Sequence, residues 1–450
     1  MIADAGGLAL LSLLLLAAGA GVTGLAGWWR GGRELMRSLG LSYLVGVAAF
    51  GVTAQLLYVL GAAMSLAEVC LLCGVLALGM ARALPGRAPR VARARPSRAA
   101  LVWVLLPCSI VLALLAVDLW YQPLWAYDSW TFWTPKAHGL AALGGLDTSW
   151  FTSGDMLGGA RRDYPLLLPA VEAAGFRFTG YETTLLDLQS WLFLVAFVVM
   201  IWQATTARAQ SVVVGAVLLM VVIAPSTAAQ LASAEADIPL AAFIGAAGLC
   251  GLLWLETGKR STLVLAAVLA AGAAATKVEG VIFAGALFAA LSGCSWRRSR
   301  ADAATAAVAL VAAVALGLLP WRIWVAVHGG PATGKVPSLS PATLVHHISY
   351  IPYAGGYLLY KLLDPRGWLL IAPLWAVATW QAWRAGRREI VLFVAGMVTL
   401  SLCGLVITYW STPLDLHFHL ATSARRVVTS LVFFCAALTP LLAVPARESR

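Results

Sequence analysis

Charged residues are scarce in this chain. Only 11% of its 450 residues are Asp, Glu, Lys or Arg, whereas 61% are apolar. A water-soluble globular domain carries about 25% charged residues, so the composition excludes that class. Disorder is excluded too, because disordered chains are poor in the apolar residues that dominate here. What remains is a polytopic membrane protein.

Cysteine is also sparse. The seven cysteines are odd in number and lie within or beside apolar runs, so they indicate no disulfide framework. The Cys70-x-x-Cys73 pair stacks two small residues on one face of a helix, and we interpret it as structural. Histidine gives no zinc motif, because His417 and His419 alternate instead of following helical i, i+4 spacing. We therefore expect neither a metal nor another cofactor.

Long apolar runs are what the chain has instead. A membrane-spanning helix needs roughly 20 apolar residues, and about 13 segments approach that length. The predicted fold class is thus an all-α polytopic membrane protein. The predicted spans are 6–27, 40–61, 63–84, 100–120, 184–206, 210–226, 239–255, 262–276, 279–294, 303–326, 367–383, 390–410 and 427–444.

The net charge of +11 comes from basic clusters that flank these spans. Basic loops mark the cytoplasmic ends of spans, and placing every cluster inside gives a consistent parity along the whole chain. This pattern excludes nucleic acid as a partner and predicts a multi-pass protein of the inner (plasma) membrane. Two long loops, 121–183 and 328–366, then lie on the outer side, where loops of this length are usually functional.

The first long outer loop opens with an aspartate, Asp128, directly after a span and among three tryptophans. The aromatic residues are expected to hold a short interfacial helix at the membrane surface. They would also lower the local dielectric constant, raise the pKa of Asp128 and favour a role as proton acceptor. The alternative interpretation is a helix cap. Further along the loop, Arg161 and Arg162 either bind a lipid phosphate or pair with Asp163 and Asp155.

A second acid, Asp237, precedes a proline at the outer edge of a later span. Charges at membrane depth are candidates for function, whereas the Asp-x-Pro order also suits an ordinary helix start. Glu235 is expected to be its solvated neighbour. Lys277 and Glu279 lie between two short spans, and their spacing argues against a pair within one helix. Lys277 suits either a phosphate or an interhelical pair with another acid.

Arginines near the end of the chain complete the set of candidates. Arg425 and Arg426 follow the His417-Phe-His419 segment, and an arginine fork at the outer end of a span suits a phosphate. Arg322 is a weaker candidate of the same kind.

The order of these motifs resembles the GT-C superfamily of integral-membrane glycosyltransferases. The resemblance is to the branch of the lipid A aminoarabinose transferases and protein O-mannosyltransferases, and to a bacterial subgroup of it. It covers roughly residues 100–430 and consists of Asp128, Tyr164-Pro-Leu, Ala236-Asp237-Ile-Pro-Leu and Thr276-Lys277-Val-Glu-Gly. It implies a catalytic core at 99–444, an additional three-span segment at 1–98 and a cytoplasmic tail at 445–450.

The resemblance also implies roles for residues. Asp128 would be the catalytic base, and Asp237 would shape the acceptor site. The family often has Lys- or His-Pro-Pro-Leu where this chain has Asp163-Tyr164-Pro-Leu, so other cations must hold the phosphate. The residues expected to bind substrate are Lys136, His138, Asp163, Tyr164, Glu235, Lys277, Arg322, His419 and Arg425.

The implied reaction is inverting transfer of a sugar from a polyprenyl-phosphate donor to a hydroxyl of an envelope lipid, glycan or protein. A lipid-linked donor is needed because nucleotide-sugars are absent outside the cytoplasm. The additional N-terminal spans leave room for a partner protein. Two alternatives remain: a transporter or lipid flippase, in which intramembrane charges and broken spans also occur, and a non-catalytic scaffold for envelope assembly.

Overall fold

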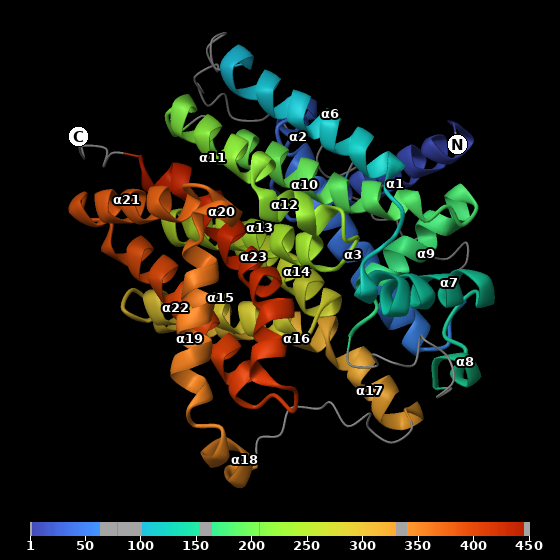
Figure 1. Cartoon of the computed structure of the whole chain (residues 1–450). Helices are drawn as coiled ribbons and strands as arrows, with labels where there is room; N and C mark the ends of the chain where they lie inside the picture. The colour runs from blue at the N-terminus through green and yellow to red at the C-terminus, as the bar shows by residue number, and fades with distance from the viewer. Residues whose placement is uncertain are drawn as a thin grey trace.

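The computed structural model describes residues 2–63, 79, 101–152, 164–206, 208–329 and 340–444 of the chain. Within these residues the protein is entirely helical, with no strand (Figure 1). The predicted span 63–84, the basic segment 82–98 and the tail 445–450 therefore lie outside the described residues, apart from residues 63 and 79.

The helices follow one another with short connections. The N-terminal ones are α1 (Ile2–Leu25), α2 (Gly32–Leu35), α3 (Leu39–Val59), the π-helical turn η1 (Leu101–Leu105) and α6 (Leu106–Tyr121). The first long loop holds the π-helical turn η2 (Ser129–Trp133), α7 (Thr134–Leu143), α8 (Thr148–Thr152) and α9 (Leu167–Thr179). The middle of the chain forms α10 (Thr184–Thr205), α11 (Ser211–Ile223), α12 (Pro225–Leu231), α13 (Asp237–Thr257), α14 (Arg260–Thr276), α15 (Glu279–Trp296), α16 (Arg300–Gly317) and α17 (Leu319–His328). The last part forms α18 (Pro341–His346), α19 (Tyr350–Leu363), α20 (Pro365–Trp368), α21 (Ile371–Arg384), α22 (Arg388–Trp410) and α23 (Leu416–Leu442).

Many of these helices are long and apolar enough to cross a membrane. Among the described residues there are 9 such helices, or 10 if α11 and α12, which meet at 51°, form one bent span. This is the architecture of a multi-pass helical membrane protein. The predicted count of 13 is not reached within the described residues.

The differences from the predicted spans have simple causes. The predicted span 262–276 is the apolar helix α14, which with 17 residues is shorter than each of the 9 helices counted above. The segment 367–383 becomes α21, whose 14 residues reach about 21 Å at 1.5 Å per residue, short of a bilayer core of about 30 Å. The segment 303–326 divides at Leu318 into α16 and α17, because Pro320 lies in the first turn of the second helix.

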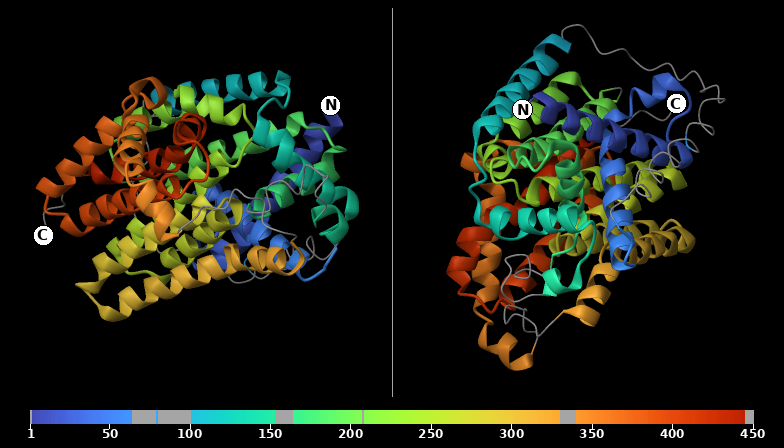
Figure 2. Two further views of the ribbon diagram at one scale, coloured as in Figure 1. Left: turned by 60° about the horizontal axis from the view of Figure 1, so that its bottom comes forward. Right: turned by 90° about the vertical axis from the view of Figure 1, so that its right-hand side faces the viewer.

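Helices α13 and α23 form the centre of the molecule. In an 18-residue apolar stretch of α13, 94% of the residues are buried inside the structure, and in that of α23 89% are buried. The corresponding share is 22% for Val102–Tyr121, which comprises most of η1 and all of α6, and 22% for α16. Both views in Figure 2 show α6 at the edge of the molecule. Close packing at the centre depends on small residues: a Cβ on Gly248 of α13 would come within 2.4 Å of the ring of Phe434 in α23.

The N-terminal helices pack onto the rest of the protein. Helices α1 and α3 lie against each other, and α3 also packs against α10 and α14. The largest hydrophobic cluster of the described residues extends from Leu11 to Leu442. The division of the chain at 98/99 falls outside the described residues and stays a prediction.

Candidate functional site

One arginine, Arg426 of α23, joins three carboxylates that are far apart in the sequence. Its Nη1 lies 2.7 Å from Asp128 Oδ2, its Nη2 lies 2.9 Å from Glu235 Oε2, and its Nε lies 2.8 Å from Asp237 Oδ2. A guanidinium group has five N–H donors in a planar fork, so it can serve three acids at once. The first long loop, the α12–α13 connection and α23 therefore meet at this side chain.

A second cation, Lys277, extends this cluster. Its Nζ lies 2.9 Å from Asp237 Oδ1 and 3.5 Å from Glu279 Oε1. Asp237 thus bridges both cations, with its side chain 1% exposed. Burying an unpaired carboxylate at this depth would cost several kcal/mol, which explains why each Asp237 oxygen has a cationic partner. We call Asp128, Glu235, Asp237, Lys277 and Arg426 the charged cluster.

The backbone positions the acids of the charged cluster through tight local geometry. Asp128 precedes the π-helical turn η2, and such turns are frequent at functional sites. The next residue, Ser129, donates through its hydroxyl to the carbonyl oxygen of Ser233 and so fastens the first loop to the α12–α13 connection. That connection contains Ala234 at φ 46°, a left-handed conformation that costs a non-glycine residue roughly 1–2 kcal/mol.

The side chain of Asp128 makes no helix-capping hydrogen bond, and Asp237 is the first helical residue of α13, whose cap residue is Ala236. Both side chains are instead ion-paired in the charged cluster. Asp128 is the more exposed of the two, with 20% of its side chain accessible against 1% for Asp237. Of the three acids bound to Arg426, Asp128 is thus the one that an incoming molecule reaches most easily.

Glu235 does not have the predicted position in solvent, and that expectation was wrong. Only 5% of the residue is exposed, because the α12–α13 connection folds inward onto Arg426. Burial is the main reason that the pKa of Glu235 rises to about 8; Arg426 opposes the rise, and the carboxylates of Asp237 and Asp128 add to it. With Glu235 protonated near neutral pH, Arg426 and Lys277 balance the charges of Asp128 and Asp237.

Lys277 and Glu279 pair at the break between two helices and not within one helix. Lys277 also makes the interhelical pair with another acid, Asp237, that was one of its two predicted roles. Lys277 follows α14 in an extended conformation, with φ −153° and ψ 152°, and α15 begins at Glu279. The break turns both side chains toward each other and directs the lysine to Asp237.

Aromatic residues of the first loop lie beside the charged cluster. The ring of Tyr164 stacks on Trp133 at 5.1 Å between centroids, and Lys277 Nζ lies 6.0 Å from the centroid of the same tyrosine ring. Lys136 is 1% exposed; its Nζ donates to the carbonyl oxygen of Tyr164 at 3.2 Å and lies 5.6 Å from the Trp321 ring. Lys136 and Tyr164 are thus near Lys277.

The other predicted substrate-binding residues lie apart from the charged cluster. Arg425 pairs with Asp364 at 3.2 Å, and Arg322 is exposed on α17. His138 is exposed and lies 4.8 Å from the Tyr181 ring, between centroids. His419 Nδ1 lies 2.9 Å from Thr412 Oγ1. Asp163 lies outside the described residues, as do Arg161 and Arg162.

Of the two adjacent arginines, Arg425 was predicted to bind substrate, whereas the structure places Arg426 among the acids. Successive residues of a helix point about 100° apart, so only one arginine of the pair can face the acids. The flanking residues, Ala-Thr-Ser-Ala before the pair and Val-Val-Thr-Ser after it, are small or uncharged, and they carry no signal that selects Arg426. Its three partners come from segments that only the fold brings together.

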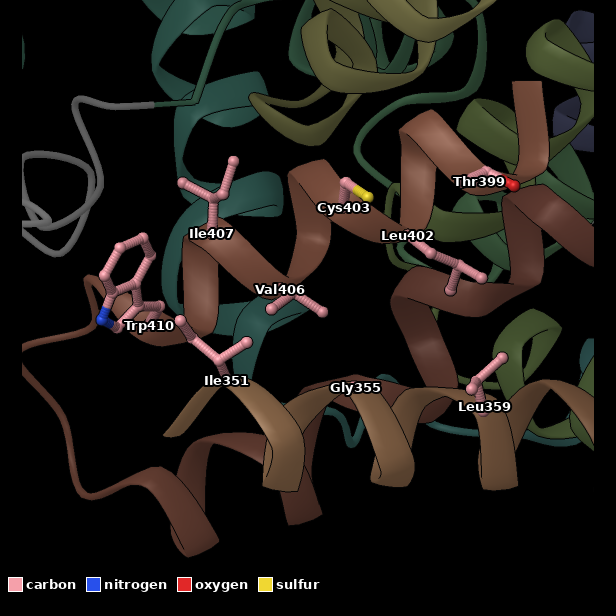
Figure 3. A pocket seen from close by; sticks show the side chains of 9 residues that line it. All are labelled: Ile351, Gly355, Leu359, Thr399, Leu402, Cys403, Val406, Ile407 and Trp410. Atoms are coloured by element: carbon pink, nitrogen blue, oxygen red, sulfur yellow. The ribbon is translucent and has the colours of Figure 1, made fainter. Parts of the chain in front are cut away.

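An apolar groove lies between α19 and α22 (Figure 3). Its volume is about 460 Å³, and it contains no charged side chain. Val406 and Leu402 of α22 point toward α19, where Gly355 leaves room for Val406. The lining residues are Ile351, Gly355, Leu359, Thr399, Leu402, Cys403, Val406, Ile407 and Trp410. The groove can hold hydrocarbon but offers no charged group, so the candidate site is the charged cluster.

Within the described part of the chain, no three His, Cys, Asp or Glu side chains are grouped so that they could hold a metal ion. Comparison of the chain with protein-family models, with curated proteins and with solved structures finds no match.

Proposed function

We propose that the protein is a membrane glycosyltransferase that moves a sugar from a polyprenyl-phosphate donor to an acceptor hydroxyl at the outer membrane surface. The observation that carries the proposal is the charged cluster itself. Asp128, Asp237 and Lys277 belong to separate motifs of the GT-C resemblance, and they lie together around Arg426. A cluster with both an accessible carboxylate and two cations has the parts that such a transfer needs.

Asp128 is the general base in this proposal. The acceptor hydroxyl gives its proton to the Asp128 carboxylate while its oxygen forms a bond to the anomeric carbon. The bond from that carbon to the phosphate oxygen breaks, and its electron pair stays on the phosphate. A positioned general base typically contributes about 10² to 10⁴ in rate. One base and direct displacement give inversion at the anomeric carbon, since retention would use a carboxylate as nucleophile.

Arg426 and Lys277 bind the phosphate and stabilise the charge that it gains. Preorganised cations next to a leaving phosphate act strongly in a water-poor site. Arg426 holds Asp128 at 2.7 Å in the structure. A phosphate that binds this guanidinium competes with Asp128 and releases its carboxylate, which couples donor binding to the availability of the base. Arg426 takes the place that the motif order had given to Arg425 and Arg322.

The test replaces Asp128 with Asn in protein reconstituted into proteoliposomes with a polyprenyl-phosphate sugar and an envelope extract as acceptor. We expect sugar transfer to fall by about 10²-fold or more, because the amide cannot take the proton. Insertion should stay close to wild type, and donor binding should not weaken, because the neutral amide competes less than the carboxylate for Arg426. The matched control is Asp147→Asn, an acid of the same loop whose carboxylate accepts from the Trp150 amide at 2.8 Å; its transfer rate should not change.

Three outcomes would contradict the proposal. Normal transfer by Asp128→Asn would show that another group is the base. Passage of the lipid across sealed vesicles without consumption of the donor would identify a flippase or transporter, and mass spectrometry of envelope glycans with and without the protein would show the same distinction in cells. An unaltered envelope in cells with Asp128→Asn would favour a scaffold.

A further inference from the structure

A tight turn joins α21 to α22. Arg384 is the last residue of α21, and Arg388 is the first residue of α22. Between them Gly386, at φ 77°, lets the chain reverse, and its N–H donates to the carbonyl oxygen of Trp383 at 3.0 Å. The end of α21 is therefore closed by its own backbone, which fixes the residues on both sides of the turn.

Arg387, the last residue of this turn, is directed inward. Its Nη2 lies 2.9 Å from Oε1 of Glu256, near the C-terminal end of α13, and its Nη1 donates to the carbonyl oxygen of Leu441 in α23 at 2.7 Å. The turn is thus fastened to the two central helices, at the end of α13 opposite the charged cluster. Its neighbours Arg384 and Arg388 are exposed.

Each of these two exposed arginines lies beside a tryptophan ring. The Cζ atom of Arg384 is 5.4 Å from the centroid of the Trp380 ring, and that of Arg388 is 5.6 Å from the centroid of the Trp383 ring. Trp380 and Trp383 are three residues apart in the continuous helix α21, so they are neighbours on its surface. The two rings and the two guanidinium groups therefore form one surface, which we call the arginine–tryptophan patch.

The patch lies on the face of α21 that the protein leaves uncovered. Helix α21 is at the edge of the molecule (Figure 1) and packs against α23, with Ala378 and Ala382 buried. At about 100° per residue, Trp380 lies roughly 160° around the helix from both alanines. Trp380 is 58% exposed and Trp383 46%. In a multi-pass membrane protein, such an outward face contacts lipid.

The neighbouring corner between α15 and α16 repeats this arrangement. The Cζ atom of Arg300 is 5.6 Å from the centroid of the Trp296 ring, which is exposed. Arg298 of the same corner lies 3.9 Å from Glu389 at the start of α22, so the two corners are adjacent. Because tryptophan is enriched at the level of the lipid headgroups, the exposed rings indicate that this end of the protein lies at that level.

The charge of the patch is not neutralised within the described residues. The two nearby acids, Glu256 and Glu389, pair with other arginines. In the part of the chain that the structure describes, Arg384 and Arg388 form no ion pair, and their contacts are with the tryptophan rings. Two guanidinium charges at headgroup level are therefore available to an anion.

We propose that the arginine–tryptophan patch binds the headgroup of an anionic phospholipid from the surrounding membrane. A guanidinium group binds phosphate oxygens through two parallel hydrogen bonds, and it can contact an aromatic ring at the same time. The acyl chains would lie along the exposed apolar face of α21, which includes Val377. The proposal does not depend on the proposed sugar transfer, because the patch shares no residue with the charged cluster.

The experiment measures thermal unfolding of the detergent-solubilised full chain as phosphatidylglycerol, phosphatidylcholine or inorganic phosphate is added. We expect phosphatidylglycerol to raise the unfolding temperature and the other two to leave it nearly unchanged. The double variant Arg384→Gln/Arg388→Gln should need about 30-fold more phosphatidylglycerol for half of the effect, because each arginine near an anionic lipid contributes roughly a factor of five. Both arginines are exposed, so this variant should fold.

The matched control is Arg33→Gln/Arg37→Gln, which removes two exposed arginines between α1 and α3 and should keep the response. An unchanged response in Arg384→Gln/Arg388→Gln, or an equal loss in the control, would overturn the proposal. Equal effects of the two phospholipids would overturn it too, because they would show apolar solvation alone. An equal effect of inorganic phosphate would identify a site for a free anion instead of a lipid.

Discussion

At the scale of single residues, two neighbouring arginines provide a direct comparison. Arg426 is 19% exposed and holds three acids, whereas Arg425 is 42% exposed and holds Asp364 alone. Arg426→Gln should destabilise the protein by about 3–5 kcal/mol, the range for removing one partner of a buried ion pair. Arg425→Gln should cost less than Arg426→Gln, because the Arg425 side chain is more exposed and Asp364 keeps the hydrogen bond from the Arg366 backbone N–H at 3.0 Å.

Thermal unfolding of the two glutamine variants against wild type measures this difference. Equal loss of stability in both would contradict the central position of Arg426. A stable Arg426→Gln protein would show that the three acids find other partners.

Glu235 gives a prediction for pH dependence. Its pKa is raised from 4.5 to about 8 in the folded protein. Between these two pH values the folded state therefore keeps a proton that the unfolded chain has already released. The contribution of Glu235 to stability is then fully present below pH 4.5 and is lost as the pH rises through about 8. Glu235→Gln should remove this loss, so its unfolding temperature should fall less than that of wild type between pH 6 and pH 9. Parallel curves for the two proteins would show that Glu235 ionises normally.

The residues of the candidate site were predictable only in part. Asp128, Asp237 and Lys277 stand out in the sequence because charge beside apolar runs is rare. Arg426 does not stand out, since the adjacent Arg425 has the same chemistry and the same neighbours. The burial of Glu235 was not predictable either, because it depends on a left-handed turn at Ala234 and on an arginine almost 200 residues later.

At the scale of helices, the contact between α1 and α3 depends on close approach. A Cβ on Gly46 of α3 would come within 1.9 Å of the Leu15 carbonyl oxygen in α1. Gly46→Ala should therefore push the helices apart and lower the unfolding temperature. The free energy of unfolding should fall by at least the roughly 1–3 kcal/mol that overpacking typically costs.

The control for this substitution is Gly285→Ala in α15, where a Cβ would meet nothing within 4 Å. Alanine favours a helix over glycine by roughly 1 kcal/mol, so this variant should be unchanged or more stable. The two substitutions are thus expected to have opposite signs. Equal thermal unfolding of Gly46→Ala and wild type would contradict the close contact.

Helices were easier to predict than the breaks between them. Long apolar runs such as Leu39–Val59 and Arg388–Trp410 can do little else but cross the membrane. The bend between α11 and α12 and the extended residue Lys277 between α14 and α15 are different. Pro225 marks the first of these breaks in the sequence, and the second lies where the predicted spans 262–276 and 279–294 meet. Nothing in Thr276-Lys277-Val278, however, shows that the lysine reaches Asp237.

At the scale of the whole molecule, the arrangement separates two kinds of charge. Glu256 pairs with Arg208 and Arg387 where α13 ends, in a cluster whose side chains are 17–42% exposed. The acids of the charged cluster lie at the other end of α13, where Asp237 is 1% exposed. Exposed pairs of the first kind contribute little to stability, whereas buried pairs are kept for positioning or chemistry.

This separation makes the orientation of the molecule decisive for function. Lys259 lies between α13 and α14, and Arg260 begins α14, at the end that the positive-inside rule assigns to the cytoplasm. The charged cluster at the opposite end of α13 would then face outward, where a lipid-linked donor is available and nucleotide-sugars are not. Reversed orientation would remove the reason for a lipid-linked donor, although the cluster itself would be unchanged.

Single cysteines in a chain without native cysteines test the orientation. Ser149→Cys reports on α8 of the first loop, and Thr257→Cys reports on the end of α13; both positions are exposed. In intact cells a membrane-impermeant maleimide should label Ser149→Cys, whereas Thr257→Cys should be labelled only after permeabilisation. Labelling of Thr257→Cys alone in intact cells would place the charged cluster on the cytoplasmic side. A soluble nucleotide-sugar would then be a sufficient donor, and the case for a polyprenyl phosphate would fail even if Asp128 proved to be a base.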